Sequence, residues 1–156
     1  MERFALKTSP SEGEFYFSLC VFAPLQQQNF KVICAVAEII DLKTFTDKRG
    51  NLTVIEKSIP FDIKRIFYIY GVDESKRGGH RHHKTIQAAI CINGSCTIYN
   101  NDGIEEEIFE LDKPSKCLIL EPNDWHAMYN FSRDAILMVL ASEYFDETDY
   151  VFEPYK

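Results

Sequence analysis

The chain has 156 residues, which is the length of one domain, and its 17 basic and 24 acidic side chains give a net charge of −7. This charge excludes a large nucleic-acid surface, which needs a basic face. The apolar runs are shorter than the roughly 18 residues of a membrane-spanning helix. Apolar residues at 46% and aromatic residues at 13% indicate a globular, strand-rich protein without a membrane partner.

The five cysteines contain no C-x-x-C pair and are odd in number. They are Cys20, Cys34, Cys91, Cys96 and Cys117. This pattern predicts free thiols that serve as small core residues in a reducing cytoplasm. The N-terminus also lacks the basic patch and apolar region of a signal peptide, so we expect a cytoplasmic protein.

Residues 1–31 differ in composition from the remainder of the chain. They contain Ser9-Pro10, the aromatic cluster Phe15-Tyr16-Phe17 and three consecutive glutamines, without a helical period. We interpret this segment as an N-terminal extension: an added strand, an arm exchanged with a partner, or a tail outside the fold. The main domain is expected over residues 32–156.

From residue 32 onward, short apolar and β-branched segments alternate with turn signals. Residues 47–51 are expected to turn, residues 71–79 to form a polar loop, and Asn93-Gly94 is the strongest hairpin signal. No segment has a convincing helical period, so the pattern predicts a sandwich or small barrel. The expected strands are 32–40, 52–56, 63–70, 85–92, 95–99, 104–111, 117–120 and 135–141.

All four histidines lie in two short segments, RGGHRHHK (residues 77–84) and PNDWH (residues 122–126). In an extended segment His80 and His82 point to one face and His83 to the other, because side chains alternate. Two imidazoles on one face suit metal binding or proton transfer near neutral pH. The alternative is a solvent-exposed, histidine-rich loop.

The spacing around these histidines resembles the cupin motifs. The first motif, HxH-x4-E-x6-G, is matched by His80, His82 and Gly94, with Gln87 at the Glu position. Pro122, His126 and Asn130 resemble the second motif. The resemblance implies an all-β, single-domain cupin double-stranded β-helix (jelly roll) with the histidines facing its interior.

Gln87 replaces a charged metal ligand by a neutral amide, which weakens the case for a metal. We therefore expect no metal and no cofactor. Cupins with three-histidine metal sites exist, so the alternative is a metal-dependent dioxygenase or isomerase that uses His80, His82 and His126. A non-catalytic module that binds sugar nucleotides is a further alternative.

Four segments together resemble the sugar-nucleotide 3,4-ketoisomerases grouped with the WxcM-like C-terminal domains. They are DKRGNLTVIE, IPFDIKRIFYIYGV, RGGHRHHK and the tail containing LASEYFDETDY, and the similarity spans roughly residues 33–152. The family pattern has Ala where this chain has Arg81. The resemblance implies a metal-free enzyme that moves the carbonyl of dTDP-4-oxo-6-deoxyglucose from C4 to C3. Such enzymes prepare deoxyamino sugars, here for a lipopolysaccharide or S-layer glycan, and are usually homodimers that exchange N-terminal strands.

This reaction needs a base, an acid and a donor that stabilises an enediol(ate). The carried-over acid–base pair is His80 and His82, since histidine has an unperturbed pKa near 6.5. Residues 76–84 carry four basic side chains and no acid, which favours a diphosphate ligand. The predicted substrate-binding residues are Arg49, Tyr68, Arg77, Gln87, Trp125 and His126.

Several of these residues have a structural alternative. Tyr68 could be a core aromatic, Arg49 a solvated charge, and Trp125 a cap of the barrel instead of a stacking partner for thymine. The acidic side chains near the C-terminus are expected to be solvated: Glu143, Asp146, Glu147, Asp149 and Glu153. The sequence leaves open which histidine takes the C3 proton and which face of C4 receives it.

Overall fold

The computed structural model describes residues 37–156, which form strands and one short 3₁₀ helix, η1 (Glu147–Asp149). The strands are β1 (Glu38–Asp41), β2 (Thr44–Asp47), β3 (Gly50–Thr53), β4 (Arg65–Tyr70), β5 (Arg77–His82), β6 (Gln87–Asn93), β7 (Cys96–Asn101), β8 (Glu106–Leu111), β9 (Lys116–Leu120), β10 (Trp125–Tyr129), β11 (Ile136–Ala141) and β12 (Tyr150–Val151). No helix in this part of the chain is long and apolar enough to cross a membrane.

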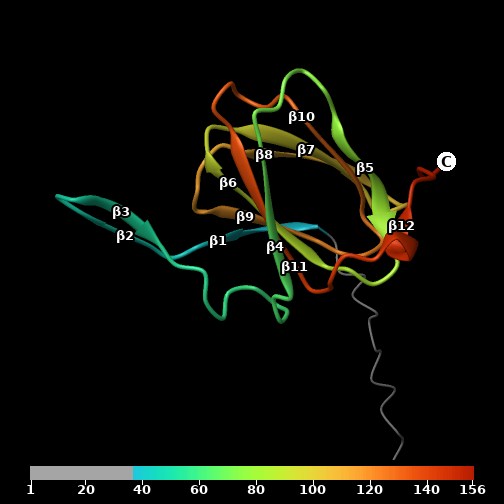
Figure 1. Ribbon diagram of the computed structural model, residues 1–156, viewed down its shortest axis with the longest axis horizontal. Coiled ribbons are helices and arrows are strands. Elements are labelled where there is room, and N and C mark those ends of the chain that lie inside the picture. The colour runs from blue at the N-terminus through green and yellow to red at the C-terminus, as the bar shows by residue number, and fades with distance from the viewer. Residues whose placement is uncertain (1–36) are drawn as a thin grey trace, which may run out of the picture. The chain divides into compact units, whose positions relative to one another are not determined.

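Ten of the strands form two antiparallel sheets that face each other (Figure 1). The first sheet has the order β1-β9-β6-β11-β4 and the second β12-β5-β10-β7-β8. The predicted all-β jelly roll is therefore confirmed. Side chains from both inner faces fill the space between the sheets, including Ile98 from β7 and Leu137 and Val139 from β11, all with no exposed surface.

A second apolar cluster lies on the outer face of the first sheet. Ala88 and Ile90 of β6 point there, and Ile55, Ile59 and Phe61 from the connection between β3 and β4 cover them. Strand β6 is consequently buried on both faces over most of its length, which explains its continuous apolar sequence.

The Asn93-Gly94 prediction was right about the turn and wrong about the hairpin. Gly94 has a positive φ of 66°, as a tight turn requires, but β6 and β7 belong to opposite sheets and do not pair with each other. The Ser95 amide donates to Ser132 Oγ and the Ser132 amide donates to the Ser95 carbonyl, at 3.0 and 2.8 Å. These bonds hold the turn against the loop after β10, so the chain crosses between the sheets.

Other strands differ from the predicted ones at their ends. Strand β5 begins at Arg77, inside the segment expected to be a loop, and β2 and β10 were not predicted. The extension over residues 1–31, Cys20, Cys34 and most of the strand expected at 32–40 lie outside the described residues. The remaining cysteines, Cys91, Cys96 and Cys117, are buried free thiols, as predicted.

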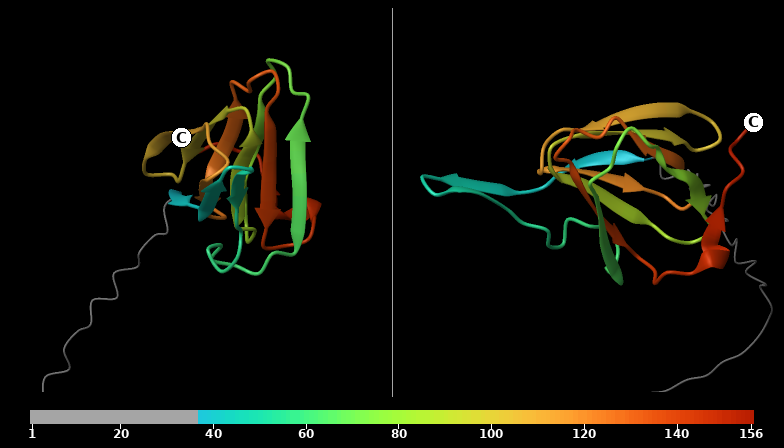
Figure 2. Two further views of the ribbon diagram at one scale, coloured as in Figure 1. Left: turned by 90° about the vertical axis from the view of Figure 1, so that its left-hand side faces the viewer. Right: turned by 45° about the horizontal axis from the view of Figure 1, so that its top comes forward.

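Strands β2 and β3 form a hairpin that projects away from the two sheets (Figures 1 and 2). Its backbone pairs run from Thr44 opposite Thr53 to Asp47 opposite Gly50. Seven of its eight strand residues are exposed, including Phe45 and Leu52 at 52% and 59%. The hairpin lies at the opposite end of the described fold from β5 and β12.

Candidate active site

Two consecutive glycines bring β5 close to β10. Gly78 and Gly79 have positive φ values of 78° and 77°, a region that favours glycine. A Cβ atom on Gly78 would lie 2.7 Å from the His126 carbonyl oxygen, where the register between the two strands shifts. The glycines of the RGGHRHHK segment therefore allow the approach that sets His80 opposite His126.

Three imidazole rings meet on the inner face of the second sheet. The ring centroids of His80 lie 5.0 Å from His82 and 5.1 Å from His126, and those of His82 and His126 are 6.2 Å apart. His83 is exposed on the other face. The prediction that His80 and His82 share one face is confirmed, and the structure adds His126 to the pair.

Both ring nitrogens of His82 are engaged. Nδ1 lies 3.0 Å from the Oδ2 atom of Asp149, and Nε2 lies 2.9 Å from the amide nitrogen of Gln87. Because a carboxylate only accepts, Nδ1 carries the hydrogen, and Nε2 accepts from Gln87. His82 and Gln87 are 2% and 3% exposed, so this geometry lies inside the roll.

Asp149 was expected to be solvated, and this was wrong: it is 3% exposed. Its carboxylate accepts from the Lys84 backbone amide at 2.9 Å and from the Thr85 hydroxyl, in addition to His82. The pairing of β12 with β5 puts Tyr150 opposite His82 and so brings the preceding Asp149 to the same place. A contact between residues 67 positions apart leaves no local signal in the sequence.

His126 is oriented by the backbone at its own turn. Its Nδ1 atom donates to the Asp124 carbonyl at 2.9 Å, and its Nε2 atom has no hydrogen-bond partner among the described residues. The Asp124 carboxylate is buried, accepting from the Glu121 amide at 2.7 Å and from the Asn100 side chain at 3.2 Å. Burial raises the pKa of Asp124 to about 6.

Four buried polar atoms are unpartnered within residues 37–156, and all belong to residues on the inner faces of the sheets: Arg65 Nε, Gln87 Oε1, Asn100 Oδ1 and His126 Nε2. One is a donor and three are acceptors. Buried polar groups are normally satisfied, so this set is suited to a ligand with several hydroxyl groups and an anionic or carbonyl oxygen. Arg65 was missed by the sequence analysis, although strand alternation puts it on the same face as Phe67.

The imidazoles are held in the neutral state. Burial lowers the pKa of His82 to about 4, assisted by the charges of His80 and Arg65 and opposed by Asp149. Burial lowers the pKa of His126 to about 3 and also lowers that of His80, whose ring faces the Gly78 carbonyl. At neutral pH each ring therefore offers a lone pair that can accept a proton.

Aromatic side chains border the histidines on one side. The Tyr150 ring lies 4.7 Å from His80 and 4.6 Å from His82, and the Phe152 ring lies 6.0 Å from His80. Together with Phe145 and Glu147, these two rings line an open cavity of about 440 Å³. The Tyr150 ring therefore borders both this cavity and the histidine cluster.

Four of the predicted site residues do not join the cluster, and three of them belong to the two large sheets. Tyr68 is 63% exposed on the outer face of β4, because Phe67 and Ile69 occupy the inner face. Trp125 packs its ring against Tyr99 and donates through Nε1 to the Phe152 carbonyl at 3.2 Å. Arg77 is exposed at the start of β5.

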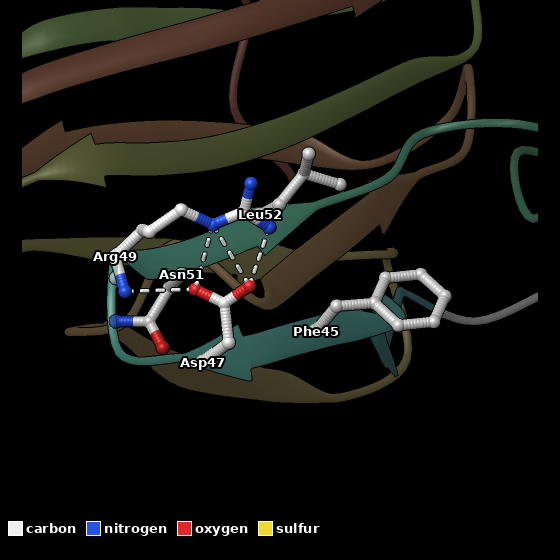
Figure 3. A pocket seen from close by; sticks show the side chains of 6 residues that line it. Phe45, Asp47, Arg49, Asn51 and Leu52 are labelled. Carbon is white, nitrogen blue, oxygen red and sulfur yellow. Dashed lines mark hydrogen bonds and ion pairs between the residues drawn. The ribbon is translucent and has the colours of Figure 1, made fainter.

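Arg49 lies in the turn of the projecting hairpin, far from the histidines of the same chain (Figure 3). Its guanidinium is 84% exposed and pairs with Asp47 at 2.5 Å. The two residues line an open cavity of about 480 Å³ with Phe45, Asn51 and Leu52. No group of three His, Cys, Asp or Glu side chains among the described residues is arranged to hold a metal ion.

Comparisons with known proteins agree on one family. The family model described as FdtA: WxcM-like, C-terminal, matches residues 35–156. TDP-4-oxo-6-deoxy-alpha-D-glucose-3,4-oxoisomerase of Aneurinibacillus thermoaerophilus is 45% identical over 117 residues, covering 73% of this chain and 84% of the relative.

Solved structures give the same result. QdtA, a sugar 3,4-ketoisomerase of Thermoanaerobacterium thermosaccharolyticum crystallised with TDP, is 47% identical with a TM-score of 0.73 and covers 75% of this chain and 88% of its own. The WlaRB TDP-quinovose 3,4-ketoisomerase of Campylobacter jejuni is 39% identical with a TM-score of 0.72, covering 75% and 92%.

Proposed function

This chain belongs to the FdtA family of WxcM-like C-terminal domains, and on that premise we propose that it is a TDP-sugar 3,4-ketoisomerase. It moves the carbonyl of TDP-4-oxo-6-deoxyglucose from C4 to C3 and so supplies a 3-oxo sugar for amination. The observation that carries the proposal is the cluster of three neutral imidazoles beside four buried, unpartnered polar atoms.

His80 is the residue we assign to the carbon-bound proton. Its ring is half-buried against the aromatic wall, and no side chain hydrogen-bonds to it among the described residues. It takes the proton from C3, which leaves an enediolate across C3 and C4, and a proton then returns to C4. The electron pair of the C3–H bond becomes the C3–C4 double bond and the C4 carbonyl oxygen becomes anionic, so no electrons leave the sugar.

His82 is the second acid–base group in this proposal. It exchanges a proton with the sugar oxygens, which move from a C3 hydroxyl and C4 carbonyl to a C3 carbonyl and C4 hydroxyl. For this the Gln87 amide must move away from Nε2 and leave its lone pair free for the ligand, while Nδ1 stays on Asp149. Arg65 is the cation that we assign to the developing oxyanion, because its buried Nε atom has no hydrogen-bond partner among the described residues.

The arrangement of donors supports metal-free catalysis. A metal held by His80, His82 and His126 would lack a charged fourth ligand, because the group beside Nε2 of His82 is the neutral Gln87 amide. Gln87 presents its N–H here, where a metal-binding carboxylate would present an oxygen. Elemental analysis of active protein is expected to show no stoichiometric metal, and a metal that restores activity after chelation would overturn this part.

The projecting hairpin supports a homodimer. Seven of its eight strand residues are exposed, and Phe45 and Leu52 present apolar surface that a second copy would cover. Exchange of β2 and β3 between two copies would bring Arg49 to the partner's site, where a guanidinium can bind a diphosphate. Sedimentation of the Phe45→Asp, Leu52→Asp variant is expected to show monomers, whereas Ile104→Asp, at an 80% exposed position, leaves the dimer intact.

The activity test combines the protein with TDP-4-oxo-6-deoxyglucose, a C3 aminotransferase and an amino donor. The expected product is a TDP-3-amino-3,6-dideoxyhexose, and NMR of that product shows which face of C4 was protonated. Absence of any 3-amino sugar while the protein still binds TDP would leave only a binding function. The buried thiols Cys91, Cys96 and Cys117 suit the reducing cytoplasm in which nucleotide sugars are made.

A further inference from the structure

Asp149 is the best-connected buried group that the proposed reaction leaves without a role. Its side chain is 2% exposed, and no lysine or arginine among residues 37–156 pairs with it. Instead it accepts three hydrogen bonds, from the His82 ring, the Thr85 hydroxyl and the Lys84 backbone amide. Burial opposes ionisation, but these bonds keep the pKa of Asp149 below its ordinary value. A buried carboxylate with this many donors is built to remain charged.

The segment around Asp149 is fixed on β5 by its backbone as well. The His83 amide donates to the Asp149 carbonyl at 3.0 Å, and Tyr150 pairs with His82 in the β12–β5 ladder. The preceding turn is closed by Asp146, which caps η1 by accepting from the Thr148 amide at 3.0 Å. The carboxylate therefore has one position relative to the His82 ring.

We infer that Asp149 is a positioning residue for the reaction, which holds His82 in the Nδ1–H tautomer and so keeps the Nε2 lone pair directed to the interior of the roll. The inference rests on the proposed function, because it gives Asp149 its effect through His82. It assigns no proton transfer to Asp149 itself.

The tautomer has a second consequence, at Gln87. A lone pair on Nε2 requires the Gln87 amide to present its N–H to His82, and the Gln87 Oε1 atom then points elsewhere without a partner. If Nε2 carried the hydrogen, the amide would turn round to accept it, and an N–H would replace the oxygen on the ligand side. Asp149 thus also determines whether Gln87 offers the substrate an acceptor or a donor.

The tautomer of His82 tests the inference in the wild-type protein, independently of any activity. Protein labelled with ¹⁵N-histidine distinguishes Nδ1–H from Nε2–H imidazole by the nitrogen shifts, and the His82 signals are identified by their loss in His82→Asn. The expected result is Nδ1–H. An Nε2–H ring would overturn the inference even if the protein were an active isomerase, and Nδ1–H in a protein without isomerase activity would refute only the proposed function.

The variant Asp149→Asn keeps the shape and removes the charge. Its kcat is expected to fall by at least about 100-fold with KM changed by less than about threefold, and its His82 signals to shift toward Nε2–H. Retention of Nδ1–H with full kcat would overturn the inference. The matched control is Glu153→Gln, which removes an exposed acidic charge from the segment after β12, leaves His82 untouched and should retain both kcat and tautomer. If Asp149→Asn does not fold, Thr85→Val, which removes one donor to the same carboxylate, is expected to give a smaller loss of kcat with the same direction of tautomer shift.

Discussion

The two ends of the described fold use polar side chains in opposite ways. At the histidine end, His82, Gln87, Asp124, His126 and Asp149 are all at most 3% exposed and hydrogen-bond to one another or to the backbone. In the β2–β3 hairpin, the exposed side chains of Asp47 and Arg49 pair with each other, and no other side chain among the described residues bonds to them. The first end is organised within one chain. The second takes part in ligand binding under the proposed exchange of hairpins between two copies, so the two ends predict different responses to mutation.

The largest expected effect comes from the two histidines, and it separates their roles. His80→Asn should reduce kcat by about 10²–10⁴-fold with little change in the free energy of unfolding, because the ring has no side-chain hydrogen bond to lose. His82→Asn should also reduce kcat while TDP binding persists. It should in addition lower the free energy of unfolding by about 2 kcal/mol, because Asp149 loses a donor in a buried site.

Steady-state kinetics and urea unfolding of both variants measure this difference. His83→Asn is the control, since that side chain is exposed directly after the end of β5. Full kcat in either His80→Asn or His82→Asn would remove that residue from the acid–base pair. Equal stability losses in both variants would contradict the distinction between a free and an anchored ring.

A smaller effect, about tenfold on KM, is expected for Arg49→Ala if the hairpin completes the partner's site. Complementation makes this a sharp test. Mixed dimers of Arg49→Ala and His80→Asn contain one site with both native residues, because each copy receives its hairpin from the other. Refolding an equal mixture should recover about a quarter of the wild-type activity at low substrate concentration.

The contrary outcome is equally clear. If Arg49 acted in its own chain's site, or only as a solvated charge, the mixture would show the average of the two separate variants. A mixture of Asp149→Asn and His80→Asn is the matched control, because both residues belong to one chain's site and no mixed dimer restores it.

The histidine end also shows how far the sequence could be read. Alternation along a strand was sufficient to predict that His80 and His82 share a face, and the turn signals located most strands to within a few residues. Alternation applied to IKRIFYIY would have found Arg65 as well, because Phe67 and Ile69 of the same face are core residues. Tyr68 was placed in the site by family resemblance, and its face of the strand points outward.

What the sequence could not supply was pairing between distant segments. Asp149 was read as one more solvated acid in an acidic tail, since nothing within that tail marks it as buried. Its partners, Lys84 and Thr85, come from the segment after β5, and only the β12–β5 ladder brings the two together. The hairpin predicted at Asn93-Gly94 was wrong for the same reason. A local turn signal does not determine which sheet the next strand joins.

Acid should destabilise the histidine end selectively. The pKa of His82 falls from about 6.5 in the unfolded chain to about 4, so between these values the unfolded state binds a proton that the folded state does not. The free energy of unfolding is therefore not reduced by this group above pH 6.5. As the pH falls toward 4, protonation of His82 in the unfolded chain lowers it by about 3 kcal/mol. His126 acts in the same direction. Asp124 opposes both, because its pKa is raised to about 6.

Urea unfolding at pH 7.5, 6.0 and 5.0 measures how steeply the free energy of unfolding depends on pH. A free energy of unfolding that stays constant over this range would contradict the neutral, buried state of the two rings. His83→Asn should not alter the slope. The hairpin pair of Asp47 and Arg49 adds little to it, since exposed ion pairs contribute little to stability.

The smallest effect is expected at Trp125, and it decides between cap and ligand contact. Trp125→Phe removes the indole N–H that donates to the Phe152 carbonyl and should lower the free energy of unfolding by about 1 kcal/mol, with KM unchanged within about twofold. Had the indole stacked on thymine, its loss would raise KM about tenfold or more, since base stacking contributes about 1–3 kcal/mol. The ring packs on Tyr99, on the face of β10 away from the histidines. A change in stability without a change in KM would therefore show that Trp125 holds the segment after β12, through the Phe152 carbonyl, and does not contact the nucleotide.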